Sequence, residues 1–150
     1  MFEDFAPKTQ LATKRAEELA QHLHDESVAT GHLIFGLTTD QSVCLHHIFK
    51  DLNVDPDMFS GYVKTLPREP VVPNGPWNRH CETAFGRARD AAQQLGSKEV
   101  QPEHLALAVL SIKAGSCYET LKEFSIDPEY VQALILQAMG LDPDMVPEWF

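Results

Sequence analysis

The sequence HLIFGL at residues 32–37 recurs as HLALAV at residues 104–109, 72 positions later. Each stretch is apolar around the whole circumference of a helix, and a helix without a polar face is buried on every side. Further residues recur at the same offset without gaps: Ala16, Ala20, Gln21 and Leu23 recur as Ala88, Ala92, Gln93 and Leu95. We therefore predict two copies of one unit, with the two apolar helices at the centre of the molecule.

Each copy has the sequence pattern of four helices. Residues 12–23 and 81–95 carry apolar side chains along one helical face, and Asn78 is the expected N-cap of the second of these helices. Asp-Pro pairs at residues 55–56 and 127–128 open the last helix of each copy, because Asp caps a helix and Pro suits its first turn. The alternation typical of strands does not persist in the sequence, so the predicted fold class is all-α.

The domain organisation follows from the repeat. We predict two tandem four-helix repeats that are related by a pseudo-twofold axis and packed into one domain over residues 1–140. The predicted segments are repeat one at 3–66, a linker at 67–76, repeat two at 77–139 and a C-terminal tail at 141–150. Four prolines indicate the linker, because they remove backbone donors and interrupt helices. One repeat alone buries only a thin core, so we expect the two to pack together and leave a seam between them.

The composition argues against several classes of partner. The 150 residues contain 12 Lys plus Arg against 22 Asp plus Glu, a formal net charge of −10. This charge repels phosphate backbones and anionic lipid, so neither nucleic acid nor a membrane surface is an expected partner. No apolar run reaches the roughly 18 residues of a membrane span. The acidic N-terminus lacks the pattern of a signal peptide, so we expect a cytoplasmic location.

The sequence patterns do not predict an enzyme. Neither a phosphate-binding glycine loop nor a nucleophile elbow occurs in the sequence, and we predict no cofactor. Cys44, Cys81 and Cys117 lack the spacing of zinc ligands and are predicted as small buried hydrophobic residues. Metal binding is not predicted, because the neighbouring histidines point to different sides of their helices. The repeated His32 and His104 are expected to bond backbone groups in the first turn of a helix.

These residues together resemble a known family, the double Clp N-terminal repeat of the Clp/Hsp100 AAA+ unfoldases. The motifs that carry the resemblance are Phe2-Glu3-Asp4-Phe5, then Thr30-x-His32-Leu33-x-x-Gly36-Leu37, and in the second copy Trp77, Val100 and Glu103-His104-Leu105. The resemblance covers about residues 2–140 and is closest to the ClpC type.

The resemblance implies a non-catalytic, all-helical domain. In that family the domain captures adaptors and substrates and passes them to an ATPase ring, which threads them into a peptidase. The implied partners are Clp adaptor proteins, unfolded or tagged protein substrates, and a Clp ATPase. The chain is then either the N-terminal domain of such an ATPase or a free-standing regulator. An alternative is a small-ligand or metal-sensing helical protein that reuses the fold, a hypothesis motivated by the seven histidines.

The resemblance also implies candidate binding residues. In ClpC-type members, a Thr at the first helix start and the Glu of a T-E-H motif bind phosphorylated arginine. Those positions hold Ala6 and Gly31 in the first copy but Asn78 and Glu103 in the second, so only the second copy keeps polar groups there. The family's aromatic positions persist. The expected peptide- or adaptor-binding residues are Phe2, Phe5, Trp77, Asn78 and Glu103. For Phe2 and Trp77 a position in the core is the favoured alternative, and for Glu103 the alternative is a carboxylate that only stabilises its helix start.

Overall fold

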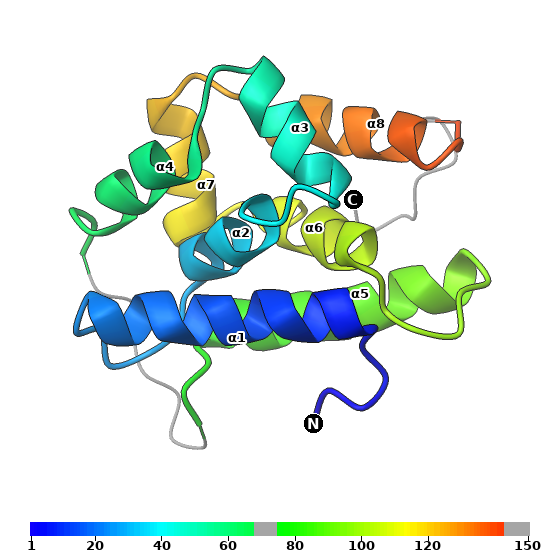
Figure 1. The fold of residues 1–150 in the computed structure, drawn as a ribbon, viewed down its shortest axis with the longest axis horizontal. Coiled ribbons are helices and arrows are strands. Elements are labelled where there is room, and N and C mark those ends of the chain that lie inside the picture. Colours follow the sequence, from blue (N-terminus) through cyan, green and yellow to red (C-terminus); the bar gives the residue numbers. More distant parts are fainter. Residues whose placement is uncertain (68–74, 143–150) are drawn as a thin grey trace.

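The computed structural model describes residues 1–67 and 75–142, and within these ranges the chain forms eight α-helices and no β-strand (Figure 1). The predicted all-α fold is confirmed. The helices are α1 (Pro7–His22), α2 (Thr30–Thr38), α3 (Cys44–Asp51), α4 (Pro56–Val63), α5 (Arg79–Gln94), α6 (Pro102–Leu110), α7 (Gly115–Glu123) and α8 (Pro128–Ala138). Residues 68–74 of the expected linker and residues 143–150 of the expected tail lie outside the described residues.

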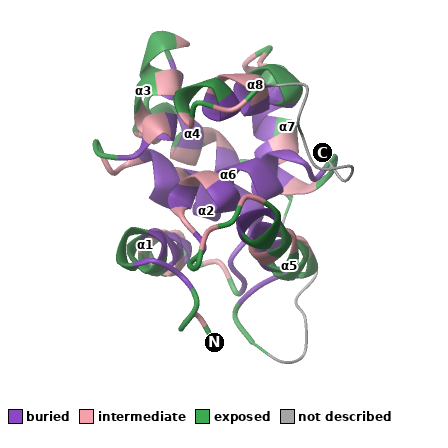
Figure 2. Ribbon diagram, turned by 90° about the vertical axis from the view of Figure 1, so that its right-hand side faces the viewer, coloured by how far each residue is buried: buried purple, intermediate pink, exposed green. Residues whose placement is uncertain are grey.

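The two halves of the chain follow the same helix order. The helices α1 and α5 begin 72 residues apart, as do α2 and α6, and α4 and α8. Figures 1 and 2 show three layers, with α1 and α5 on one side, α2 and α6 in the middle, and α3, α4, α7 and α8 on the other side. The two apolar helices therefore occupy the predicted central position.

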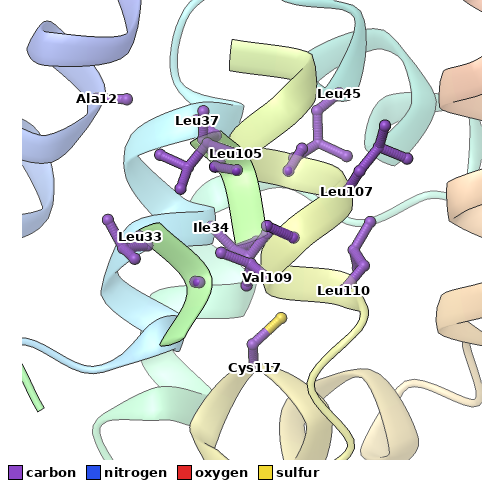
Figure 3. Packing of buried hydrophobic residues seen from close by; sticks show 14 of the residues in the cluster. Ala12, Leu33, Ile34, Leu37, Leu45, Leu105, Leu107, Val109, Leu110 and Cys117 are labelled. Carbon is purple, nitrogen blue, oxygen red and sulfur yellow. The ribbon is translucent and has the colours of Figure 1, made fainter. Parts of the chain in front are cut away.

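Side chains of α2 and α6 form the middle of the hydrophobic core. Leu33, Ile34 and Leu37 of α2 and Leu105 and Leu107 of α6 are completely buried. In Figure 3, Leu37 lies beside Leu105 and Ile34 beside Val109, whereas Leu33 and Leu107 lie on opposite outer sides of the helix pair. Burying an aliphatic side chain of this size stabilises the fold by roughly 1.5–3 kcal/mol. The stability of the fold therefore depends strongly on the helices that pack around α2 and α6.

Two short backbone bridges also connect the repeats. Phe5 pairs with Val100, and Val28 pairs with Trp77, each as an isolated parallel bridge. In both bridges the amide that follows the aromatic residue donates to the valine carbonyl over 3.0 Å. The segment before the first helix of each repeat is thus held by the other repeat, and the two contacts are related by the same 72-residue offset.

The helices α1 and α2 approach each other closely at Gly36. A Cβ atom at this position would lie against the carbonyl oxygen of Ala12, and 3.3 Å from the backbone nitrogen of Ala16. Both neighbours belong to the backbone of α1, which cannot rotate away as a side chain can. Glycine at this position therefore sets the distance between the two helices.

We expect Gly36→Ala to lower the free energy of unfolding by about 1–3 kcal/mol, because overpacking against a fixed backbone outweighs the roughly 1 kcal/mol gain in helix propensity. Thermal unfolding followed by circular dichroism measures the change. The control is Gly86→Ala on α5, where the new Cβ would meet no described atom within 4 Å. That variant should gain roughly 0.5–1 kcal/mol. Equal gains in both variants would show that α1 moves aside freely.

The repeated histidines hold the first turns of α2 and α6. The Nδ1 atom of His32 accepts the backbone N–H of Ala29 over 2.8 Å, and Nδ1 of His104 accepts that of Gln101 over 2.9 Å. The proton of each neutral imidazole is therefore on Nε2, and in His32 this group donates to the Asp25 carboxylate over 3.0 Å. The predicted structural role of the histidine pair is confirmed.

Both imidazoles are more easily kept neutral in the fold than in water. Burial lowers the pKa of His104, and it lowers the pKa of His32 against the opposing effect of the Asp25 carboxylate. An unfolded chain takes up these protons near pH 6.5. The contribution of the two residues to stability is therefore complete above about pH 6.5 and is lost as the pH falls toward their folded pKa values.

We expect the free energy of unfolding to decrease between about pH 7.5 and about pH 5, and to decrease less in the double variant His32→Gln/His104→Gln. Glutamine still accepts and donates hydrogen bonds at a helix start but does not titrate. Urea unfolding at the two pH values measures both changes. The same loss in the two proteins would contradict the assignment of the pH dependence to these imidazoles.

Candidate functional site

Four aromatic rings form one cluster between the N-terminal segment and α5. The ring centroid of Phe2 lies 4.9 Å from that of Phe5, 5.6 Å from that of Trp77 and 5.0 Å from that of Phe85. The rings of Trp77 and Phe85 meet edge to face at 5.0 Å. The Arg89 guanidinium lies over the Phe5 ring at 5.1 Å. The cluster joins the start of repeat one to the first helix of repeat two.

The cluster is mostly an interior structure. Phe5 is 0% exposed and Trp77 is 3% exposed, whereas Phe2 is partly exposed. Of the three aromatic residues expected to bind a peptide, only Phe2 therefore presents part of its ring to solvent. The expected binding roles of Phe5 and Trp77 stay predictions. In this structure their rings pack against the ring of Phe2. The role of Phe85 as an aromatic partner was not predicted, because its position is that of an ordinary core residue.

Asn78 is the N-cap residue of α5. Its side-chain oxygen accepts the backbone N–H of Cys81 over 3.0 Å, and the residue is 1% exposed. The predicted N-cap is thus confirmed. A side chain held in this way orients α5 beneath the aromatic cluster, and its expected contact with a bound peptide stays a prediction.

Glu103 lies in the first turn of α6 and is partly exposed. A carboxylate is favoured there by the partial positive charge of the helix N-terminus. Cys44 lies at the start of α3, and the pKa of its thiol is raised to about 11. Burial is the main cause, and the negative charge of Glu103 is the second. The thiol is therefore protonated at neutral pH and is a poor nucleophile. Glu103 is thus a partly exposed carboxylate of repeat two, on a helix that also packs against α3 of repeat one.

Gly31 is the residue of repeat one that is equivalent to Glu103, and side chains of other helices pack closely around it. Gly31 is buried, and its backbone N–H donates to the Ser116 hydroxyl over 2.8 Å. A Cβ atom on Gly31 would lie 2.7 Å from Cγ2 of Val63 and 2.8 Å from that hydroxyl oxygen. The neighbouring Thr30 hydroxyl accepts the backbone N–H of Cys117 over 3.2 Å. Repeat one therefore has no room for the carboxylate that repeat two carries.

We expect Gly31→Glu to lower the free energy of unfolding by more than about 3 kcal/mol, because the new side chain would overpack the contact with α7 and bury a charge. Chemical denaturation measures the loss. The matched control is Gly61→Glu on α4, where the added Cβ has no described atom within 4 Å and stability should change little. Comparable stability of the two variants would mean that the packing around Gly31 yields easily.

We also searched the described part of the chain for a metal site and for membrane-spanning helices. Within residues 1–67 and 75–142, no three His, Cys, Asp or Glu side chains lie together as metal ligands would. His46 and His47 each lie within hydrogen-bond distance of a backbone carbonyl, at 2.6 Å and 2.7 Å. The helices in these ranges are too short or too polar for any of them to cross a membrane.

The comparison with protein families gives the class of the chain. Residues 4–124 and 77–147 match the family described as the Clp repeat (R) N-terminal domain. These matches extend over most of the sequence, and the chain belongs to this family. Two overlapping matches in one chain also agree with the duplication seen in the helix order.

Curated relatives carry names of the Clp ATPases. A probable ATP-dependent Clp protease ATP-binding subunit of Chlamydia pneumoniae is 26% identical over 143 residues, which cover 93% of this chain and 17% of the relative. The chaperone protein ClpB of the same organism is 28% identical over 114 residues, covering 73% and 13%. The chloroplastic chaperone protein ClpD1 of Oryza sativa subsp. japonica is 23% identical, covering 91% and 16%. The chain thus spans less than a fifth of the length of these relatives.

Solved structures share the fold. The Hsp104 N-terminal domain from Candida albicans superimposes with a TM-score of 0.75 at 17% identity, covering 94% of this chain and 97% of that one. The N-terminal domain of ClpD from Arabidopsis thaliana superimposes with a TM-score of 0.66 at 18% identity, covering 93% and 97%. The all-helical architecture is therefore that of Clp/Hsp100 N-terminal domains.

Proposed function

We propose that this chain is a non-catalytic, cytoplasmic protein-binding domain that recognises adaptors or protein substrates for a Clp-type ATP-dependent unfoldase or protease. It acts either as the N-terminal domain of the ATPase or as a free-standing regulator that competes for the same adaptors and substrates. Membership of the Clp repeat family along most of the chain supports this function.

The position of Glu103 is the single observation that assigns a binding site to this proposed function. The residue keeps a partly exposed carboxylate at the start of α6, a helix that packs against α2 and α3 of the other repeat. A carboxylate pairs strongly with an arginine guanidinium, because two parallel charged hydrogen bonds form. We propose that a bound polypeptide places an arginine, unmodified or phosphorylated, at Glu103. The filled space around Gly31 supports one such site per chain.

Phe2 is the proposed apolar contact. Its ring is partly exposed and is held in place by three further rings beneath it. A rigid aromatic side chain loses little conformational freedom on binding, so it suits an anchor for an apolar residue of the partner. Phe5, Trp77 and Asn78 would then act from the interior, by fixing the surface that Phe2 completes.

The test is binding of an unfolded, arginine-containing polypeptide, with one synthetic peptide tested in unmodified and arginine-phosphorylated forms. We expect Glu103→Gln to raise the Kd by about tenfold for any form whose arginine contacts Glu103, since a charged hydrogen bond contributes roughly 1.5 kcal/mol or more. Fluorescence anisotropy measures the Kd. Pull-down with the purified chain, followed by mass spectrometry, then identifies Clp adaptors, substrates or ATPase among the captured proteins.

The matched control is Glu99→Gln, which removes one exposed carboxylate close in sequence and leaves α6 unchanged. Its Kd should equal that of the parent chain. Equal binding by the Glu103→Gln protein would remove Glu103 from the site. An absence of binding to every peptide, adaptor and unfolded polypeptide would contradict the proposed function itself.

A further inference from the structure

Arg89 of α5 contacts three residues of the segment that precedes α1. Its Nε group donates to the Asp4 carboxylate over 2.7 Å, and its Nη2 group donates to the backbone carbonyl of Met1 over 2.9 Å. The guanidinium also lies over the Phe5 ring, 5.1 Å from the ring centroid. Met1 and Asp4 flank Phe2, so one side chain of repeat two holds the chain on both sides of that residue.

Phe2 lies just before the part of the chain that the backbone bridge holds. The bridge begins at Asp4, whose carbonyl accepts the backbone N–H of Val100 over 2.9 Å. The Phe2 carbonyl accepts the backbone N–H of Phe5 over 3.0 Å, which closes a turn, and it also accepts from the Gln10 side chain over 3.1 Å. The position of the Phe2 ring therefore depends on the side chains that hold this turn, Gln10 from repeat one and the arginine from repeat two.

The ion pair between Arg89 and Asp4 is partly exposed, with 37% and 46% of the two side chains open to solvent. The hydrogen bond from Arg89 is the main reason that the pKa of the Asp4 carboxyl lies below its ordinary value. An exposed pair of this kind contributes little to stability, because both groups are also well solvated when apart. The guanidinium is nevertheless a rigid, planar set of donors that fixes the direction of the groups it binds. The contact therefore suits the positioning of the turn better than the stabilisation of the fold.

The second repeat does not carry this ion pair. The residues equivalent to Arg89 and Asp4 at the 72-residue offset are Glu17 and Pro76, which cannot form it. The segment before α5 keeps its backbone bridge all the same, and there the amide of Val28 donates to the Pro76 carbonyl over 2.6 Å. The fold thus does not require the pair at both equivalent places, and the pair occurs at the segment that presents a partly exposed aromatic ring.

We propose that Arg89 is a positioning residue for the binding of a polypeptide partner. It fixes the turn that carries Phe2, so that the exposed part of the Phe2 ring meets an apolar residue of the partner in one orientation. A side chain that is already ordered loses less conformational freedom on binding, so the affinity rises without any contact between Arg89 and the partner. The role assigned to Arg89 rests on the proposed function, in which Phe2 is the apolar contact.

The position of Phe2 is tested first in the whole chain without a ligand. Nuclear Overhauser effects should connect the ring protons of Phe2 and Trp77, whose ring centroids lie 5.6 Å apart. We expect Arg89→Ala to lose these contacts while the midpoint of thermal unfolding changes little, because the ion pair is exposed. The matched control Lys98→Ala removes a cation that lines the same surface pocket as Asp4, and it should keep the contacts. Unchanged contacts in the Arg89→Ala protein would overturn the positioning role.

Binding is then measured by fluorescence anisotropy with a synthetic peptide that contains one arginine and several leucines. We expect Phe2→Ala to raise the Kd about tenfold and Arg89→Ala about threefold, with Lys98→Ala unchanged.

The double variant Phe2→Ala/Arg89→Ala separates positioning from direct contact. Its Kd should equal that of Phe2→Ala alone, because Arg89 acts only through Phe2. A further threefold increase in the double variant would mean that Arg89 touches the peptide or supports the whole fold, and it would overturn the proposal. No effect of Arg89→Ala alone would overturn it too, while leaving the proposed function intact. An unchanged Kd in the Phe2→Ala protein would instead remove Phe2 from the proposed site, and the role of Arg89 in binding with it.

Discussion

The packing of α2 against α6 is the contact on which the rest of the structure depends. Neither helix has a polar face, so each must be covered on every side. The helices α1 and α5 cover one side and the four outer helices cover the other. In a single repeat these helices would be partly uncovered, because some of their neighbours belong to the other copy, as where α7 packs against α2. The duplication in the sequence is therefore a requirement of the hydrophobic core.

The same contact explains why the candidate sites differ between the repeats. The N-terminal end of each central helix meets the other repeat, at Ser116 for α2 and near Cys44 for α6. Glycine at the start of α2 lets α7 come close enough for a hydrogen bond. The equivalent position at the start of α6 carries a partly exposed glutamate, Glu103. Glycine at one of two equivalent positions and glutamate at the other thus give one closed contact and one partly exposed carboxylate.

Much of the fold was predictable because its signals are local or repeated. The offset of 72 residues, the Asp-Pro helix starts and the Asn78 cap each follow from short patterns, and the structure shows all of them. The burial of Phe5 was not predictable, because it depends on rings from both repeats meeting in space. The closed space at Gly31 was also hidden, since the atoms that fill it come from Val63 and Ser116, far away in the sequence.

The paired bridges of Phe5 with Val100 and of Val28 with Trp77 have a consequence for the origin of the domain. If the two units were separate identical chains, this reciprocal exchange would make a twofold symmetric dimer, and each substitution would appear at both equivalent places. Joining the units in one polypeptide removes that restriction. Each half is then free to specialise while the other preserves the shared scaffold, so one gene encodes an asymmetric surface on a nearly symmetric frame.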